Sequence, residues 1–361
     1  MLKRIFYRWE RSLASVDNNR VVRPVEWGAD GLTEHGGSPH GDPETYVREY
    51  VDRVMKDSDA WYHVDPSPSY GTAALPADAR PGERMITFPS AITTPDPENN
   101  TVYLRYFPAA SKRRGNGEAR PRRAVVVMAQ WNADEGGHVG VCRLMASLGI
   151  SAVRLSLPYH DRRMPPALSR ADYIVSSNVG RTLTVNRQAV LDARRAVSWL
   201  KQQGYDRVGI LGTSLGSCLA LLTITHEPLI DAVVLNHVSS WFGDVIWEGL
   251  STAHVRAGFD GNLDLPALRD AWRPISPKCY MHKVGQRPSL FVYALYDLSF
   301  PLHLSMDIVA ESRRCGVPTT VRVLPCGHYT TGKAPFKFLD GYYMASFLRR
   351  HLETTDSGGC L

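Results

Sequence analysis

Short apolar runs alternate with helical segments through most of this 361-residue chain, and this alternation restricts its fold more than any other feature. The runs at 122–131 and 151–159 are apolar at nearly every position, so both faces of each strand must be covered. Helical periodicity fills the intervals, as in residues 186–204, where Gly204 ends a long helix. Strands buried on both faces and joined by helices predict an α/β fold with a mainly parallel sheet.

The alternation starts near residue 84 and divides the chain. We expect residues 1–83 to form an N-terminal extension and residues 84–355 to form the main α/β domain. In the extension, Asp42 can cap a helix that begins at Pro43. A second amphipathic helix at the chain start should pack on the domain or on a second subunit of a homo-oligomer, or lie on a membrane surface. Its apolar face comprises Leu2, Ile5, Phe6, Trp9 and Leu13.

Composition excludes several classes of function. The net charge is +6, but residues 111–123 alone hold six basic residues against Glu118, with no aromatic residue among them, so we expect no nucleic-acid partner. No window is long and apolar enough to span a bilayer, which predicts a soluble, cytoplasmic protein. The six cysteines form no C-x-x-C pair, so we expect reduced thiols and neither a metal site nor a cofactor.

A serine interrupts one of the buried strand-to-helix transitions. Residues 207–213 predict a strand and residues 217–225 a helix, with G-T-S-L-G between Gly212 and Gly216. A strand that turns directly into a helix forces its middle residue into a strained conformation, and side chains two positions away would collide with neighbouring strands. This G-x-S-x-G pattern therefore predicts that the hydroxyl of Ser214 is exposed at the edge of the sheet, where catalytic groups gather in such folds.

The motif and the order of elements over about residues 84–352 resemble the α/β-hydrolase family. The resemblance implies a mostly parallel eight-stranded sheet with helices on both faces, and a serine, an acid and a histidine in that chain order. Here these are Ser214 as nucleophile, Asp297 as the acid at the end of the strand SLFVYALYD, and His328 as general base after the last strand. Asp244, after the preceding strand, is the alternative acid.

The resemblance also implies two backbone donors for a developing oxyanion. Leu215 supplies one because it follows the nucleophile. The second belongs to the loop AQWNADEGG, where this chain departs from the family's His-Gly pattern; we place it at Trp131, with Gln130 or Asn132 as alternatives.

The substrate pocket is expected between this loop and a small cap inserted at residues 241–287, where the family commonly carries one. Aromatic residues of the cap can pack as core or line an apolar pocket. Histidines at the ends of strands can line the pocket without transferring protons. The pocket residues predicted are Gln130, His160, Trp241 and Phe242, with Trp247 and His237 as further candidates.

These features predict a serine hydrolase that cleaves a small-molecule carboxylic ester through an acyl-enzyme. The stretches LPYHDRR and DARRAVSWL resemble esterases of the acetyl-esterase and dienelactone-hydrolase kind. A peptidase, thioesterase or acyltransferase would use the same three residues. A binding protein that kept the fold without catalysis is the alternative from another class.

Overall fold

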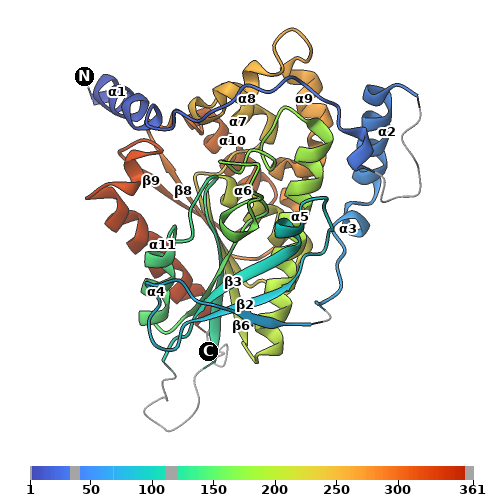
Figure 1. The fold of residues 1–361 in the computed structure, drawn as a ribbon. Coiled ribbons are helices and arrows are strands. Elements are labelled where there is room, and N and C mark those ends of the chain that lie inside the picture. Colours follow the sequence, from blue (N-terminus) through green and yellow to red (C-terminus); the bar gives the residue numbers. More distant parts are fainter. Residues whose placement is uncertain (1, 33–40, 68, 111–120, 354–361) are drawn as a thin grey trace.

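One sheet of nine strands runs through the computed structural model, which describes residues 2–32, 41–67, 69–110 and 121–353 (Figure 1). The strand order is β1-β2-β3-β5-β4-β6-β7-β8-β9. β1, β2 and β3 pair in antiparallel fashion, β3 is antiparallel to β5, and the rest of the sheet is parallel. The strands are β1 Gly71–Ala73, β2 Arg84–Pro89, β3 Thr101–Phe107, β4 Arg123–Met128, β5 Ser151–Leu155, β6 Arg207–Thr213, β7 Ala232–Asn236, β8 Ser289–Ala294 and β9 Thr319–Leu324.

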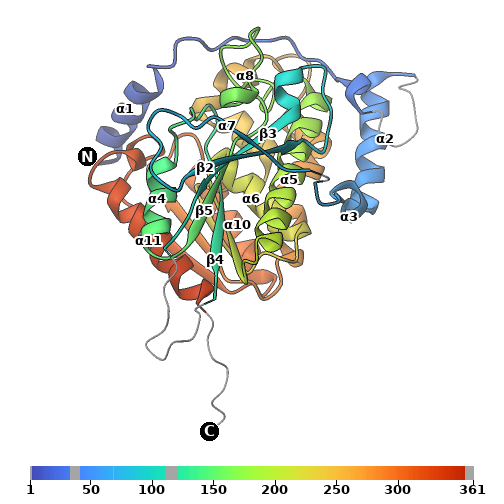
Figure 2. The same cartoon turned by 60° about the horizontal axis from the view of Figure 1, so that its bottom comes forward.

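Helices cover both faces of the sheet, as its apolar strands require. α4 and α11 pack on one face, against alternate residues such as Val125 and Val127 of β4, while α5, α6 and α10 pack on the other, against residues such as Val126 (Figure 2). The α-helices are α1 Leu2–Ala14, α2 Pro43–Lys56, α3 Ser58–Trp61, α4 Val139–Ser147, α5 Val179–Gln202, α6 Leu215–His226, α7 Phe242–Glu248, α8 Ala253–Ala257, α9 Leu265–Ala271, α10 Leu302–Arg314 and α11 Phe336–Leu352.

The structure differs from the sequence prediction in the number of strands and in the start of one long helix. The sheet has nine strands instead of eight because β1, from the predicted extension, pairs with β2. α5 begins at Val179, seven residues before the predicted start, with Asn178 accepting a hydrogen bond from Arg181 N. The predicted insertion at 241–287 is largely helical: a 3-10 turn joins α7 to α8, and two further 3-10 segments follow α9. The division into domains stays a prediction.

The first two helices lie on opposite sides of the molecule, and the chain between them crosses over the cap helices (Figure 1). The predicted helix capped by Asp42 is confirmed, since Thr45 N donates to its carboxylate over 3.0 Å. α1 packs on the sheet domain through Phe6, Glu10 and Ala14. Most of its predicted apolar face is exposed, including Leu2, Ile5 and Trp9.

Two further expectations from the sequence concern the basic segment and membrane-spanning helices. Most of the basic segment at 111–123 lies outside the described residues. Among the helices that are described, none combines the length and apolar character needed to cross a bilayer.

Candidate active site

Ser214 stands at the junction of β6 and α6 in a strained backbone conformation, with φ 56° and ψ −122°. A Cβ on Gly212 would collide with the carbonyl of Gly216. A Cβ on Gly216 would collide with the carbonyls of Met128 and Ala129, at the end of β4. The turn is therefore tight enough that only glycine fits on either side, and the serine projects from the carboxyl edge of the sheet.

Ser214, His328 and Asp297 form a continuous hydrogen-bonded chain. Ser214 Oγ lies 3.1 Å from Nε2 of His328, and Nδ1 of the same ring lies 3.0 Å from Oδ2 of Asp297. The other carboxylate oxygen, Oδ1, accepts hydrogen bonds from the backbone N–H groups of Ser299 and Phe300, at 2.8 and 2.6 Å. The Phe300 ring stacks on the imidazole of His328 with centroids 5.3 Å apart. Each member of the chain is thus oriented by the next.

A second imidazole shares the carboxylate. His237, directly after β7, donates from Nδ1 to Oδ2 of Asp297 over 2.8 Å, and its ring lies 4.6 Å from that of His328. Its side chain is 1% exposed and its backbone is left-handed, with φ 57°. The two Nδ1 atoms and the carboxylate lie within 4.8 Å of one another, a spacing a metal ion could also bridge, but each nitrogen already hydrogen bonds to the carboxylate.

These contacts adjust the basicity of both partners. Burial alone would raise the pKa of Asp297, but the positive field of His328 and the hydrogen bonds from both imidazoles lower that pKa well below its usual range. Burial alone would lower the pKa of His328, but the charge and hydrogen bond of Asp297, with a smaller contribution from Glu10, raise it above its ordinary value. The carboxylate stays ionised and favours the protonated imidazole that proton abstraction from Ser214 would produce.

The backbone around the serine offers donors for an oxyanion. Leu215 N opens α6 beside Ser214. Of the three alternatives for the second donor, Asn132 is already engaged, because its N–H donates to Nε2 of His160 over 3.0 Å. Within the described part of the chain, neither Gln130 N nor Trp131 N has a hydrogen-bond partner outside the sheet ladder. These two N–H groups therefore remain available as the second donor.

Two cavities meet at Ser214. A small one, of about 30 Å³, is mostly apolar. It is lined by Trp131, Val175, Ser214, Leu215, Cys218, Phe242, Val245, Ile246, Ser251, Thr252 and Phe300. A larger one, of about 640 Å³, has a mixed polar and apolar lining and also reaches His328 and His237. Ser214 therefore lies between a small apolar compartment and a wider one of mixed polarity.

Solved structures share this architecture. An acylaminoacyl peptidase of Pyrococcus horikoshii matches 77% of this chain with a TM-score of 0.60 and 16% identity, and the match covers 43% of that chain. Acetyl xylan esterase 1 of Thermoanaerobacterium sp. JW/SL YS485 matches 94% of this chain and 98% of its own, with a TM-score of 0.58 and 15% identity. An acetyl xylan esterase of Paenibacillus sp. R4 matches 90% and 99%, with a TM-score of 0.62 and 14% identity.

This chain has the α/β-hydrolase fold. At such identities the likeness extends to the fold alone. No protein-family model and no curated protein sequence matches the chain. This chain spans less than half the length of the peptidase that it resembles.

Within this α/β-hydrolase fold, the predicted pocket residues occupy different positions. Gln130 lines the larger cavity and Phe242 the smaller one, while Trp131 lines both. His160 is buried and lines neither; its ring accepts from Asn132 N and thereby holds the loop after β4. Trp241 also lies outside both cavities, with the guanidinium of Arg269 over its ring.

The alternative acid is engaged elsewhere in the fold. Both carboxylate oxygens of Asp244 accept hydrogen bonds from Arg269, at 2.8 Å each. This bidentate pair joins α7 to α9. Asp297 is the carboxylate that meets His328.

Several polar residues around the site had no clear signal in the sequence. Asn236 donates to Asp340 Oδ2 over 2.8 Å, and both residues line the larger cavity with His237. Burial raises the pKa of Asp340 to about 6. His138, also at this cavity, contacts Thr213 Oγ1 over 2.9 Å, and burial lowers its pKa to about 4. The position of Asn236 at a strand end, next to the predicted candidate His237, is the sequence feature that could have pointed to it.

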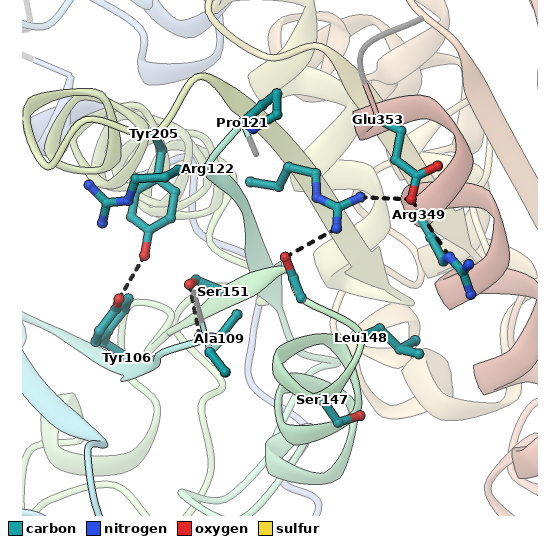
Figure 3. A pocket seen from close by; sticks show the side chains of 13 residues that line it. Tyr106, Ala109, Pro121, Arg122, Ser147, Leu148, Ser151, Tyr205, Arg349 and Glu353 are labelled. Atoms are coloured by element: carbon teal, nitrogen blue, oxygen red, sulfur yellow. Dashed lines mark hydrogen bonds and ion pairs between the residues drawn. The ribbon is translucent and has the colours of Figure 1, made fainter. Parts of the chain in front are cut away.

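Another cavity, of about 320 Å³, lies at the opposite edge of the sheet, where β4 and β5 begin (Figure 3). Its arginines are engaged: Arg123 pairs with Glu353, and Arg122 lies over the ring of Tyr205. Tyr205 and Tyr106 hydrogen bond to each other over 2.6 Å. Ser214, His328 and Asp297 are all at the other edge, so this cavity is separate from the candidate active site.

Proposed function

We propose that this chain is a serine hydrolase that cleaves carboxylic esters with a short acyl group, through an acyl-enzyme. One observation carries the proposal: Ser214 Oγ, the imidazole of His328 and the carboxylate of Asp297 are joined by hydrogen bonds of 3.1 and 3.0 Å. A serine hydroxyl is a weak nucleophile at its own pKa, and this arrangement is the one that activates it.

Acylation follows from the geometry. Nε2 of His328 takes the proton of Ser214 as Oγ bonds to the ester carbonyl carbon, and the carbonyl electron pair moves to the oxygen. The N–H of Leu215 and that of Trp131 or Gln130 receive this oxyanion. Collapse of the tetrahedral intermediate breaks the bond to the alcohol oxygen, which takes the proton from His328. The products are a free alcohol and an acyl ester on Ser214.

Deacylation repeats these steps with water. His328 removes a proton from water, the resulting hydroxyl attacks the acyl carbon, and Oγ of Ser214 leaves with the proton that His328 carried. A carboxylic acid and the free enzyme result. Asp297 stays ionised throughout, because its lowered pKa disfavours accepting the proton.

The two cavities suggest how an ester is oriented. The compartment of about 30 Å³, between Trp131, Phe242 and Ile246, has room for an acyl group of two or three carbons. The compartment of about 640 Å³, which is lined by both polar and apolar groups, suits a larger alcohol portion that carries polar groups. This asymmetry favours short-acyl esters over long-chain lipids. Two of the structural neighbours are acetyl xylan esterases by name, which is consistent with this reading.

Labelling by a fluorophosphonate probe tests the proposal. The wild-type protein should become labelled and should hydrolyse p-nitrophenyl acetate, and Ser214→Ala should do neither. Ser251→Ala is the matched control, because Ser251 lines both cavities, and it should still be labelled. An unlabelled wild type would instead favour a binding protein without catalysis.

A panel of substrates distinguishes the related activities. Turnover of p-nitrophenyl esters should fall steeply from acetate to octanoate. Faster turnover of an acylated peptide or of an acyl thioester, at equal concentration, would shift the assignment to a peptidase or a thioesterase. Transfer of the acyl group to an added alcohol in preference to water would indicate an acyltransferase.

A further inference from the structure

The N-terminal helix α1 carries a buried carboxylate that contacts the loop of His328. Glu10 is fully buried, although it belongs to a helix with exposed apolar residues. Its Oε2 accepts a hydrogen bond from the backbone N–H of Tyr329, and Oε1 accepts one from that of Thr330, each over 2.9 Å. Both N–H groups directly follow His328 in the chain. A residue more than 300 positions away in the sequence thus holds the loop that carries the base.

The loop is shaped to receive this carboxylate. A Cβ on Gly327, the residue before His328, would overlap the Glu10 carboxyl group. Phe6, one turn earlier in α1, stacks on Tyr296 with centroids 4.8 Å apart, and Tyr296 precedes Asp297. α1 therefore touches the residues next to the acid and next to the base, and Figure 1 shows it beside β8 and β9, the two strands that lead to them.

We propose that Glu10 is a positioning residue for His328: its carboxylate fixes the backbone of the loop so that Nε2 stays within reach of Ser214. This inference rests on the proposed function, since it assigns the N-terminal helix a role in that same site. The three contacts at Gly327, Tyr329 and Thr330 define the loop on both sides of His328. Displacement of a catalytic group by about 1 Å can cost a hundredfold in rate.

A role in packing alone does not account for this arrangement. A buried carboxylate loses its hydration, so an apolar residue would be the better choice if α1 only covered the domain. Both oxygens of Glu10 are directed to loop N–H groups, which form the stronger, charge-assisted class of hydrogen bond. Among the described residues, the hydrogen-bond donors to this buried carboxylate are thus the backbone N–H groups of the loop of His328.

The carboxylate also acts on His328 through its charge. The charged and titratable groups in contact with the ring or its loop are Asp297 and His237 from the strand ends, Glu10 from α1, and Tyr329 with Arg20 beside it. The cavity that His328 lines also holds Asp17, His138, Arg170, Lys337 and Asp340. Burial disfavours the imidazolium, while Asp297 and, to a smaller extent, Glu10 favour it and raise the pKa of His328. Loss of the Glu10 charge should lower this pKa, an effect that loss of packing alone would not produce.

The test compares Glu10→Gln, Glu10→Asp and Glu10→Ala in the full chain. Glu10→Gln keeps the size of the side chain, but its amide N–H₂ faces one of the loop N–H donors. We expect kcat for p-nitrophenyl acetate to fall about tenfold in Glu10→Gln and up to about a hundredfold in Glu10→Ala, with KM changed less than about twofold. Glu10→Asp should recover part of kcat. Glu49→Gln, an exposed site on α2, is the matched control and should match wild type.

The pH profile of kcat/KM and an NMR titration, which does not depend on turnover, distinguish a positioning role of Glu10 from a purely structural one. The acidic limb of kcat/KM should move to lower pH in Glu10→Gln and stay in place in Glu10→Asp. NMR titration of the His328 ring, assigned with a His328→Gln variant, should show the same fall. If Glu10→Gln keeps kcat within twofold and both titrations are unmoved, the proposal is wrong. If Glu10→Ala fails to fold by circular dichroism, the Gln and Asp variants decide.

The same measurements separate this inference from the proposed function. A wild type that neither hydrolyses esters nor reacts with a fluorophosphonate would overturn the proposed function. The NMR titration would still measure the effect of Glu10 on the pKa of His328. If the pKa of His328 is then lower in Glu10→Gln than in wild type, the action of Glu10 on His328 is supported even though the protein catalyses a different reaction.

Discussion

His237 donates a hydrogen bond over 2.8 Å to Oδ2 of Asp297, the same oxygen that faces the base. With the backbone N–H groups of Ser299 and Phe300 on Oδ1, the carboxylate is met by four donors. Each donor withdraws negative charge from the carboxylate. The strength with which Asp297 supports a protonated His328 therefore depends on a residue that touches neither the serine nor the proton in transfer.

Replacement of His237 should move the acidic limb of the kcat/KM profile to higher pH. Because the pKa of His328 is raised, the acidic limb of wild-type kcat/KM should lie above pH 6.5, the ordinary value for histidine. In His237→Asn, Asp297 loses one donor, carries more negative charge and favours the imidazolium more strongly, so the limb should move to still higher pH. Asparagine suits this left-handed backbone position. A limb at unchanged or lower pH would contradict the charge-sharing account.

Substitution of the two candidate acids should give opposite results. Asp297→Asn removes the charge that orients and supports His328, so we expect kcat/KM to fall about a thousandfold or more. Asp244→Asn breaks only the pair with Arg269 between α7 and α9, and should keep esterase activity within a few-fold of wild type. Steady-state kinetics with p-nitrophenyl acetate measures both. Loss of activity in Asp244→Asn, with a stable fold, would reverse the assignment.

Glycine at position 216 should matter for stability in a way that another helical glycine does not. A Cβ at Gly216 meets the carbonyls that end β4, so Gly216→Ala should destabilise the protein by about 1–3 kcal/mol or more, from overpacking. A Cβ at Gly140 in α4 meets nothing within 4 Å, so Gly140→Ala should be neutral or stabilising by up to about 1 kcal/mol. Urea unfolding of the two variants checks this, and equal effects would count against the close approach at the serine turn.

Enlargement of the small cavity should change the preferred acyl length. Ile246→Ala removes three carbon atoms from its lining, and we expect the ratio of butyrate to acetate turnover to rise about tenfold. Ile224→Ala is the control, since Ile224 is equally buried in α6 but lines neither cavity. Both should cost about 2–5 kcal/mol of stability. A similar change of preference in both variants would mean that the cavity does not hold the acyl group.

The sequence was sufficient for the features that depend on local patterns. Apolar runs buried on both faces predicted the parallel sheet. The glycines on either side of Ser214 predicted the strained turn, because the backbone conformation is set by the neighbouring residues themselves. Asp297 and His328 were predicted from the order of residues that the resemblance to the α/β-hydrolase family implies, and the structure brings both into hydrogen-bonding distance of their partners.

The contacts between distant segments could not be predicted in this way. The short strand β1 has no pattern of its own and exists because β2 offers an open edge. Periodicity identified α1 as a helix but did not predict that it contacts the domain through Glu10, because a buried carboxylate has the sequence pattern of a surface residue until its partners are known. His160 and His237 looked alike in the sequence, yet one holds a loop and the other shares Asp297.

The chain by itself therefore determined the order of its elements and the strained turn at Ser214, since these follow from backbone sterics and from apolar periodicity over a few residues. Only the tertiary structure decided which polar groups are paired. A buried ion or imidazole is stable only where specific donors and acceptors converge on it, and for Glu10, His237 and Asp297 those partners come from segments that are far apart in the chain.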